Sequence, residues 1–360
     1  MTDNKEELFP IVSETGETIG RATRAACHSG SRLLHPVVHL HVLNSRGELF
    51  LQLRPAWKDI QPNRWDTACG GHVAYGETVE QALEREVQEE LGITCYSPTE
   101  IARYAYDSVR ERELVCVNLT IYNDALHPSA EELNGGRFWS IEEIRNNIGK
   151  QVFTPNFESE FKQIVLPSLS SATLIRQAVP SDAPLIAELI MTALGQDLCL
   201  FLQGPDHTRE QLHQLFTLMS CRDDTQYSYR NALLAEQGGQ VAGLALSYDG
   251  SLLPELRPVF IQAMREHFGR ELELVDETQA GELYLDSFAV REPFRKQGIG
   301  SALLRATLRK TRLLHLPELG LLVDIDNIRA QRVYAAAGFK QRDSRPFGNH
   351  YMYHLTQPVQ

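Results

Sequence analysis

The sequence predicts a chain of two α/β domains, and three observations lead to that prediction. At 360 residues the chain exceeds the size at which single hydrophobic cores usually stop growing. Strand-like apolar runs alternate with amphipathic helical segments in both halves. Near Pro167 the text PSLSSAT has a proline, several serines and no hydrophobic period, which is typical of a linker. We therefore expect a first domain at 1–166, a linker at 167–173 and a second domain at 174–360.

The elements of both domains follow from turn residues and periodicity. In the first domain we expect a hairpin of 37–42 and 48–53, a helix at 78–91, a strand at 114–122 and a helix at 141–147. In the second we expect a strand LIRQAV, a helix at 182–194, two strands around the Gly-Gly turn of ALLAEQGGQVAGLALSY, and the strand ELYLDSFAV. A glycine-bearing loop with a helix, the strand LGLLVDI and a last helix complete it.

Composition excludes several classes of protein. Apolar residues are 42% and charged residues 23%, as in folded globular chains. A net charge of -12 argues against nucleic acid or an anionic membrane as partner. The N-terminal text MTDNKEELFP has no signal pattern and no run of 18 apolar residues occurs, so we expect a cytoplasmic protein. The six cysteines form no CxxC pair, which indicates reduced thiols rather than disulfides or a zinc cluster.

Three glutamates on one helix form the first candidate site. Thr78 and Gln81 have capping-box spacing, and an apolar stripe at every fourth residue follows them. Glu86, Glu89 and Glu90 lie within roughly 100° of arc on that helix. Carboxylates grouped at a partly buried edge need a counter-charge, and Mg²⁺ accepts carboxylate ligands together with substrate phosphates. The alternative for glutamates alone is a solvated acidic helix face.

The residue spacing around these glutamates favours metal binding over a solvated helix face. In the sequence, five residues separate Gly71 from Glu77, and seven separate Glu77 from Arg85-Glu86-Val87. One residue then precedes Glu89-Glu90, and one more precedes Gly92-Ile93. It matches the Nudix box throughout, so this region resembles a Nudix hydrolase. The resemblance implies an αβα sandwich and Mg²⁺- or Mn²⁺-dependent cleavage of a nucleoside or other organic diphosphate. It also implies metal ligands at Glu86, Glu89, Glu90 and the Gly71 carbonyl, a catalytic role for Glu89, and a Glu77–Arg85 pair that holds the loop.

A narrower resemblance extends beyond the box. The stretches RAACHSGSRLLHPVVHLHVLN, NRWDTACGGH and FWSIEEI are similar to isopentenyl-diphosphate isomerase and to the Nudix hydrolases related to it. The resemblance implies that His28, His35 and His72 bind a metal, and imidazole nitrogens suit a transition metal or zinc. The alternative is that His35 caps a strand and His28 is simply exposed.

One cysteine decides between the two activities. The isomerase needs a cysteine acid/base directly before the glycine and histidine of its loop, and that position is Gly70 here. Cys69 is one residue early, and a shift of one residue turns a strand side chain to the other face. The hydrolase glutamates are all present. We therefore predict a hydrolase, with isomerase activity as the alternative.

The second half contains an anion-binding pattern. The strand ELYLDSFAV is followed by Arg295, two residues, Gly298, one residue and Gly300 at a helix start, where backbone N–H groups and the helix dipole favour a pyrophosphate. A turn into a helix is the alternative. Further along, the sequence DNIRAQRVYAAAGF supplies a second motif. With both motifs present, residues 174–357 resemble the GNAT acyltransferase superfamily. The resemblance implies a mixed-sheet fold with acetyl-CoA as co-substrate.

The GNAT resemblance also implies roles for particular residues. The pyrophosphate would be held by Arg295 and by backbone amides, and pantetheine would pair with the strand end, while Asn327 would belong to the cofactor site. Tyr334 would protonate the departing thiolate. The amides are those of Gln297, Gly298, Ile299, Gly300, Ser301 and Ala302, and the strand end is Phe288, Ala289 and Val290.

The acceptor side is less determined by motifs. An amine acceptor arrives protonated and needs a base. Asp286 is our candidate, and Glu282 and Tyr284 share its strand face by period two. The acidic insertion between Tyr248 and Leu283 suits a cationic acceptor. A third hypothesis for the whole chain is that one domain senses a ligand and regulates the other.

Overall fold

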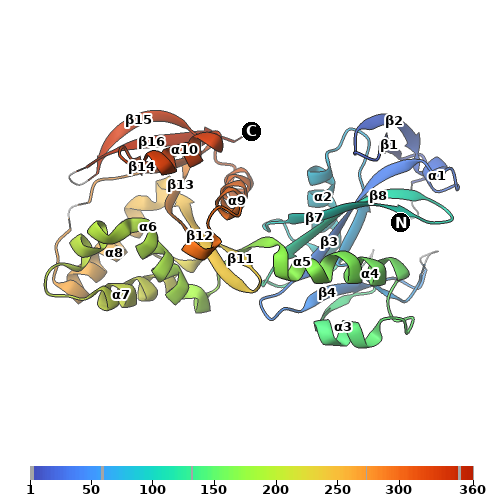
Figure 1. The fold of residues 1–360 in the computed structure, drawn as a ribbon, viewed down its shortest axis with the longest axis horizontal. Coiled ribbons are helices and arrows are strands. Elements are labelled where there is room, and N and C mark those ends of the chain that lie inside the picture. The colour runs from blue at the N-terminus through green and yellow to red at the C-terminus, as the bar shows by residue number, and fades with distance from the viewer. Residues whose placement is uncertain (1–3, 58–60, 131–132, 273, 348–349, 360) are drawn as a thin grey trace. The chain divides into compact units, whose positions relative to one another are not determined.

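The computed structural model describes residues 4–57, 61–130, 133–272, 274–347 and 350–359. Its contacts divide the chain into two compact units, Met1–Leu174 and Ile175–Gln360, which we call the N-terminal and C-terminal units (Figure 1). Both units combine helices with a mixed sheet, which confirms the α/β fold class expected from the sequence.

The N-terminal unit begins with a hairpin and continues as a mixed sheet. Its strands are β1 (Leu8–Val12), β2 (Thr18–Thr23), β3 (Leu34–Leu43), β4 (Leu49–Leu53), β5 (Trp65–Asp66), β6 (Cys69–His72), β7 (Thr99–Asp107), β8 (Arg112–Ile121) and β9 (Gly136–Trp139). The strand order is β5-β4-β3-β8-β7, with β6 paired to β3 and β9 paired to β4. The expected hairpin is present as the antiparallel pair β3–β4, in which Val42 opposes Phe50.

Alternating side chains of these strands form two cores, one on each face of the sheet. On one face β3 packs Val38, Leu40 and Val42 against α2 (Val79–Leu91). On the other face Leu49 and Leu51 of β4 pack against α3 (Ile141–Asn147), α4 (Pro155–Glu160) and the π-helical turn η1 (Phe161–Val165). The short helix α1 (Arg24–Cys27) precedes β3. The unit is therefore the αβα sandwich that the resemblance implied.

The segment expected to be a linker has regular structure. Residues 166–171 form α5 (Leu166–Ser171), which continues the helical path of α4 and η1. Phe157, Phe161, Val165 and Leu169 recur at every fourth residue and pack into one core. This period runs through the serine-rich sequence, and Pro167 lies in the first turn of α5, directly after the π-helical turn. The linker prediction missed this helix for that reason.

The C-terminal unit has a single mixed sheet. Its strands are β10 (Thr173–Gln177), β11 (Ala232–Gln237), β12 (Gln240–Asp249), β13 (Glu282–Val290), β14 (Glu318–Asp324), β15 (Lys340–Phe347) and β16 (His350–Pro358), in the order β10-β11-β12-β13-β14-β16-β15. The pair β13–β14 is parallel and its neighbours in the sheet are antiparallel. This is the mixed sheet expected from the GNAT resemblance.

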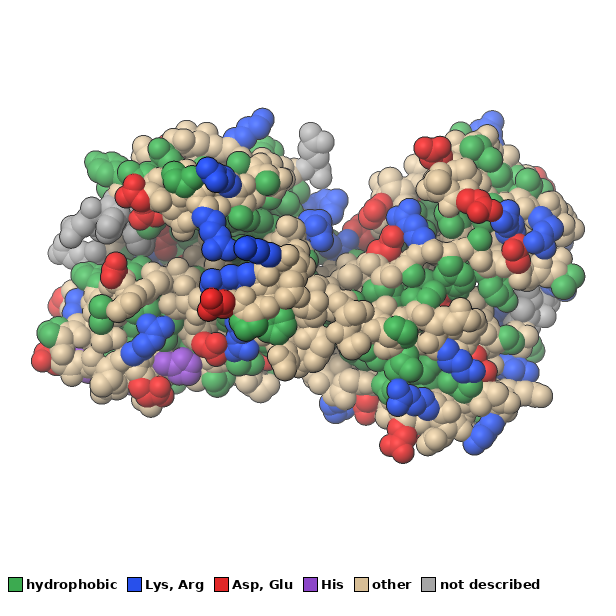
Figure 2. Space-filling view, viewed as in Figure 1, with side chains coloured by type: hydrophobic (Ala, Val, Ile, Leu, Met, Phe, Trp, Pro, Cys, Tyr) green, Lys and Arg blue, Asp and Glu red, His purple; other side chains and the backbone are tan. Residues whose placement is uncertain are grey.

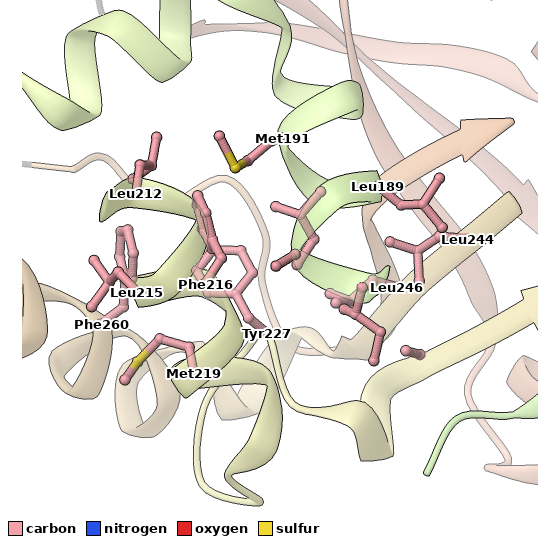
Figure 3. Close-up of a cluster of buried hydrophobic side chains, with 14 of the residues drawn as sticks. Leu189, Met191, Leu212, Leu215, Phe216, Met219, Tyr227, Leu244, Leu246 and Phe260 are labelled. Atoms are coloured by element: carbon pink, nitrogen blue, oxygen red, sulfur yellow. The ribbon is translucent and has the colours of Figure 1, made fainter. Parts of the chain in front are cut away.

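Helices cover both faces of this sheet (Figure 1). On one face lie α6 (Ala183–Gln203), α7 (Arg209–Cys221) and α8 (Leu253–Phe268), whose core includes Phe216, Tyr227 and Phe260 (Figure 3). On the other face lie α9 (Ile299–Leu313) and α10 (Ile328–Ala336). Short 3₁₀ turns at 180–182, 229–231, 250–252 and 292–294 connect the elements.

One helical stretch has the length and composition of a membrane span. In the described residues this is Pro180–Gln203, and 39% of its most apolar 18-residue window is buried. Asp182, Glu188 and Asp197 interrupt the stretch, so it contains no run of 18 apolar residues. Its backbone is also broken at Gly195, where φ is 78° and ψ is 176°, and Ile186, Leu189 and Ile190 belong to the core.

Candidate functional site

The glutamates of the first candidate site are positioned by the helix α2. Thr78 and Gln81 form the predicted capping box, and Gly92 ends the helix in the left-handed conformation with a φ of 68°. Leu83, Val87 and Leu91 are buried against the sheet. The glutamates therefore lie along the edge of the buried stripe, with 51% of the Glu89 side chain exposed and 14% of the Glu86 side chain exposed. Glu90 is 7% exposed.

Arg85 connects this helix to the loop before it. Its guanidinium donates through Nε and Nη2 to both oxygens of Glu77, each at 3.0 Å, and through Nη2 to the His72 carbonyl at 3.0 Å. Nη1 donates to Glu86 Oε1 at 2.7 Å. Burial works against the charge on Glu77, but the hydrogen bonds from Arg85 and from the Ala74 N–H outweigh it and lower the pKa of that carboxyl. The Glu77–Arg85 pair expected from the sequence is thus present.

Two glycines let the strand β6 approach the glutamates closely. The Gly70 N–H donates to Glu90 Oε2 at 3.3 Å. A Cβ atom at Gly71 would lie 1.9 Å from the Glu86 carboxyl carbon, so any side chain there displaces that carboxylate. The Glu86 and Glu90 carboxylates at the sheet and the solvent-facing Glu89 carboxylate supply oxygen ligands of the kind that a hard divalent cation binds. Glu86 and Glu90 thus lie against β6, and Glu89 Oε2 lies 3.4 Å from Arg85 Nη1, but the ligand atoms of the three glutamates do not all lie within 4.8 Å of one another.

Substitution of Gly71 tests this close approach. We expect Gly71→Ala to push Glu86 aside and to weaken Mg²⁺ binding by at least tenfold, as measured by titration calorimetry, with little change in stability. Gly20→Ala is the matched control, because a Cβ at Gly20 meets no atom nearer than Ile11 at 4.0 Å. Equal Mg²⁺ affinities in wild type and Gly71→Ala would contradict the assignment.

A second cluster lies on the other face of β6. Ligand atoms of His28, His35, His72 and Glu111 all lie within 4.8 Å of one another. His28 Nε2 is 3.2 Å from His72 Nε2 and 3.2 Å from Glu111 Oε2. The structure thus brings the three predicted histidines together and adds Glu111, which sequence reasoning missed. Glu111 comes from the tip of the β7–β8 hairpin, and no local motif marks it.

Two histidines of this cluster, His35 and His72, have lowered pKa values, and one nitrogen of His35 has no partner among the described residues. Burial lowers the pKa of His35 and lowers that of His72 well below its usual value. His35 Nδ1 donates to the Leu33 carbonyl at 3.0 Å, while its buried Nε2 has no hydrogen-bond partner among the described residues. A buried imidazole nitrogen without a partner is the observation that a metal ligand would explain. The donor set therefore fits a transition metal or zinc.

The strand register separates Cys69 from these histidines. In the β3–β6 pair Leu40 opposes Cys69, His39 opposes Gly70 and Val37 opposes His72. Cys69 is fully buried in the core beneath α2, while Gly70 borders the His39 ring. The cysteine therefore points to the glutamate face, as the sequence argument predicted.

A buried network of His39, His41, Tyr104 and Glu160 lies on the histidine face and was not foreseen. Glu160 accepts from His39 Nδ1 at 3.0 Å, from His41 Nε2 at 2.6 Å and from the Tyr104 hydroxyl at 2.7 Å. Burial works against the charge on His39, but the Glu160 carboxylate outweighs it and raises the pKa of His39 to about 9. His39 is therefore an imidazolium at neutral pH.

This ion pair predicts how stability depends on pH. Since the folded pKa of His39 lies above the unfolded value near 6.5, its contribution is complete below about pH 6.5 and disappears as pH rises through about 9. We expect it to be on the order of 3 kcal/mol at pH 6, from about 1.4 kcal/mol per pH unit between the two values.

The measurement is urea unfolding followed by tryptophan fluorescence, because Trp57, Trp65 and Trp139 all lie in the N-terminal unit. The stability difference between wild type and His39→Gln is expected to be largest at pH 6 and to shrink at pH 10. His127→Asn, at an exposed histidine, is the control. A difference that does not change with pH would refute the prediction.

In the C-terminal unit the loop before α9 presents backbone N–H groups. Lys296 and Gly298 have φ values of 64° and 81°, and α9 begins at Ile299. The first amides of a helix lack helical acceptors, so those of residues 298–301 are available to an anion. The Ala302 N–H, which the sequence analysis included, already donates to the Gly298 carbonyl at 3.0 Å.

Side chains near this loop bond to backbone carbonyls of the segment that precedes it. Arg295 Nε donates to the Val290 carbonyl at 3.0 Å, and the Gln297 amide donates to the Pro293 carbonyl at 2.9 Å. Phe288 lies beneath Gly300. Figure 2 shows Lys and Arg side chains gathered in the region of α9, where the sequence of the helix carries Arg305, Arg309, Lys310 and Arg312. These residues follow the loop by about two to four helical turns, and Lys310 donates to the Ser247 carbonyl at 2.9 Å.

The neighbouring strands diverge where pantetheine was expected. The β13–β14 pairing ends at Tyr284 and Gly320, although both strands continue. Residues 285–290 remain paired to β12 on their other edge. The edge facing β14, including Phe288 to Val290, therefore offers backbone groups to a ligand.

Tyr334 and Asn327 lie on the far side of this opening. Tyr334 is 9% exposed and its ring contacts Phe288 with a centroid distance of 6.1 Å. Burial raises the pKa of Tyr334 to about 12, so its phenol stays protonated. Asn327 caps α10 by accepting from the Ala330 N–H at 3.1 Å. The Asn327 side chain thus has a structural role in the arrangement seen here.

Asp286 is the better placed of the candidate bases. It accepts from Gln226 at 3.1 Å, from the Tyr248 hydroxyl at 3.1 Å and from Ser287 at 3.0 Å. Burial raises the pKa of Asp286 in spite of these hydrogen bonds. Gln226 was not foreseen, because it comes from the loop after α7.

The other two candidates are less suitable. Glu282 is committed to His354 Nε2 at 2.8 Å and to Thr278 Oγ1 at 2.6 Å. Tyr284 is 5% exposed, and burial raises its pKa well above the usual value, so its phenol does not act as a base near neutral pH.

Comparisons with known proteins match each unit to a family. The NUDIX domain family matches residues 33–157, and the acetyltransferase (GNAT) family matches residues 201–339. An uncharacterized Nudix hydrolase of Listeria monocytogenes is 36% identical over 154 residues, which cover 42% of this chain and 90% of the relative. The isopentenyl-diphosphate Delta-isomerase of Corynebacterium diphtheriae is 33% identical over 141 residues, covering 36% of this chain and 77% of the relative.

Solved structures are similar to each unit in turn. A crystal structure of an acetyltransferase is 30% identical, with coverage of 52% of this chain and 100% of its own and a TM-score of 0.46. A MutT protein of Methanosarcina mazei is 23% identical, with coverage of 36% and 91% and a TM-score of 0.32. The chain belongs to the Nudix family through its N-terminal unit and carries a domain of the GNAT acetyltransferase family in its C-terminal unit.

Proposed function

We propose that the N-terminal unit is a Mg²⁺-dependent hydrolase of an organic diphosphate, and that Mn²⁺ replaces Mg²⁺ at the same carboxylates. The observation that carries this proposal is the packing of Gly71 against Glu86, with Arg85 joining Glu86 to Glu77 and to the loop carbonyl of His72. A divalent ion held by these residues would supply positive charge for the diphosphate and would make water at the site more acidic. Glu86, Glu89, Glu90 and the Gly71 carbonyl are the proposed ligands. Glu89, the most exposed carboxylate, orients the water.

Hydrolysis is favoured over isomerisation by the side chains of β6. Several matched relatives are isopentenyl-diphosphate isomerases, so isomerase activity is the second candidate. Against it, Cys69 lies on the face opposite the histidines, and Gly70 offers no acid or base. The complete set of glutamates supports the hydrolase.

The test is hydrolysis of a panel of diphosphates with Mg²⁺. We expect Glu89→Gln to reduce kcat by about 10²-fold or more, because metal-held charge and water positioning are lost together. Glu84→Gln, on the same helix outside the proposed ligand set, is the control. Isomerisation of isopentenyl diphosphate without hydrolysis of any diphosphate would overturn the assignment.

For the histidine cluster we propose a second metal site held by His28, His35, His72 and Glu111. The partnerless His35 Nε2 and the lowered pKa values of His35 and His72 support it. Such an ion would act as a Lewis acid next to the loop between β6 and α2. Within this chain, His35 is oriented by its bond to the Leu33 carbonyl, and Phe9 stacks on His72 with a centroid distance of 4.5 Å.

For the C-terminal unit we propose acetyl transfer from acetyl-CoA to an amine. Backbone N–H groups after Arg295 hold the pyrophosphate, and the free edge of 285–290 pairs with pantetheine. Asp286 takes a proton from the ammonium of the acceptor, the free amine attacks the acetyl carbonyl, and Tyr334 gives its proton to the departing thiolate. The splayed β13–β14 edge is the observation that supports this arrangement.

The charge around Asp286 bears on the acceptor. The acidic insertion expected to attract a cation is partly neutralised, because Arg257 pairs with Glu277 and Asp276. Asp286, which forms no ion pair with another described residue and accepts from neutral donors, is the carboxylate that we propose for a cationic amine. A cytoplasmic location fits the six free cysteines, since disulfides are typical of oxidising compartments.

Three substitutions test the transferase. We expect Tyr334→Phe to lower kcat about 10²-fold while acetyl-CoA still binds, and Asp286→Asn to remove the rise of rate with pH. Acetyl-CoA consumption against an amine panel is the measurement. Phe288→Leu should instead weaken acetyl-CoA binding. Unchanged kcat in Tyr334→Phe would exclude Tyr334 as the acid, and a screen that finds only anionic acceptors would refute the cationic class.

A further inference from the structure

His39 has one ring nitrogen committed and one available. Nδ1 donates to Glu160, whose oxygens also accept from His41 and Tyr104. In the part of the chain that the structure describes, Nε2 forms no hydrogen bond, and 14% of the side chain is exposed. A Cβ built on Gly70 would lie 3.3 Å from His39 Cδ2 and 3.6 Å from Nε2. The absence of a side chain at Gly70 leaves this edge of the ring uncovered.

The charge on the ring limits what Nε2 can bind. An imidazolium has two N–H donors and no acceptor, so its partner must be an acceptor atom. The pKa of His39 near 9 keeps the ring in this form at neutral pH. The charged groups that act on it are Glu160 from α4, Glu113 from β8 and Asp66 from β5. A largely buried charged donor without an acceptor is unfavourable, and a ligand oxygen relieves it.

The surroundings favour a neutral oxygen over a phosphate. Glu160 is a buried carboxylate on this face, and a phosphate would add like charge beside it. Burial raises the pKa of the neighbouring Glu113 to about 7. Val37, Val115 and Val117 pack together on the same face, beside the histidine cluster. A hydroxyl or carbonyl oxygen satisfies the donor without adding charge, whereas a hydrocarbon leaves it unpaired.

Gly70 places this donor next to the glutamate site. Its N–H bonds Glu90 while its Cα borders His39, so one residue of β6 lies between the two. We propose that His39, oriented by Glu160, is a specificity-determining residue of the N-terminal unit and that its Nε2–H binds an uncharged oxygen of the organic group of a diphosphate substrate. The inference rests on the proposed diphosphate hydrolysis. It selects substrates with a hydroxyl-bearing group, such as a sugar, over substrates with a hydrocarbon group.

The experiment compares ADP-ribose, whose organic group carries hydroxyls, with isopentenyl diphosphate, whose group is a hydrocarbon. Hydrolysis is measured with Mg²⁺ for wild type, His39→Phe, His39→Gln and the control His127→Asn. We expect His39→Phe to reduce the kcat/KM ratio of the two substrates about 10- to 100-fold, mainly through the KM for ADP-ribose. His39→Gln, which keeps an uncharged donor, should lie between, and His127→Asn should match wild type.

A binding readout keeps the inference testable apart from turnover. With ¹⁵N-labelled histidine and Ca²⁺ in place of Mg²⁺, saturating ADP-ribose is expected to shift the His39 Nε2 resonance, and inorganic diphosphate is not. An unchanged substrate ratio in a folded His39→Phe, or no shift with ADP-ribose, overturns the role of His39. Loss of hydrolysis of both substrates only in Glu89→Gln supports the hydrolase independently. A wild type that shows the shift but hydrolyses neither substrate removes the proposed hydrolysis and leaves the binding role standing.

Discussion

Consecutive residues of β6 face opposite sides of the N-terminal sheet, and this alternation separates two kinds of chemistry. Cys69 and Gly71 face α2 and its glutamates, while Gly70 and His72 face the histidines. The two glycines have different tasks, since Gly71 makes room for the Glu86 carboxylate and Gly70 leaves the His39 ring uncovered. Four residues of strand thus place a carboxylate cluster and a histidine cluster back to back. An insertion or deletion within β6 would exchange these roles.

Arg85 makes this arrangement rigid on the glutamate side. One guanidinium joins the loop, through Glu77 and the His72 carbonyl, to the helix, through Glu86. Because Arg85 holds Glu86 in the protein itself, a metal ion bound as we propose would meet a carboxylate that is already oriented, and less conformational freedom would be lost on binding. The C-terminal unit uses backbone in a comparable way, since the early end of the β13–β14 pairing leaves a strand edge ready for a ligand.

Local sequence patterns predicted the parts of the sites that lie close together in the chain. The capping box of Thr78, the glutamates of α2 and the Glu77–Arg85 pair follow from spacing within one helix and its loop, and all are present. The α/β class and the β3–β4 hairpin followed from periodicity and turn residues. The helix through Pro167 was missed because a four-residue apolar period was hidden by serines.

Local sequence patterns did not predict contacts between segments that are far apart in the chain. Glu160 meets His39 across 121 residues, and Gln226 meets Asp286 across 60 residues. Glu111 joins the histidines only because the β7–β8 hairpin folds back beside β3. The sequence around these residues does not distinguish them from ordinary surface glutamate or glutamine. Only the sheet register brings them to their partners.

The central claim is that β6 separates a metal site built from glutamates from the histidine face. Anomalous diffraction from crystals soaked in Mn²⁺ tests it most directly, because the ion is located without any assumption about substrate. The account predicts a Mn²⁺ peak at coordination distance from Glu86, Glu89 or Glu90 that disappears in Glu86→Gln. A peak confined to His28, His35 and His72, with none at the glutamates, would contradict it.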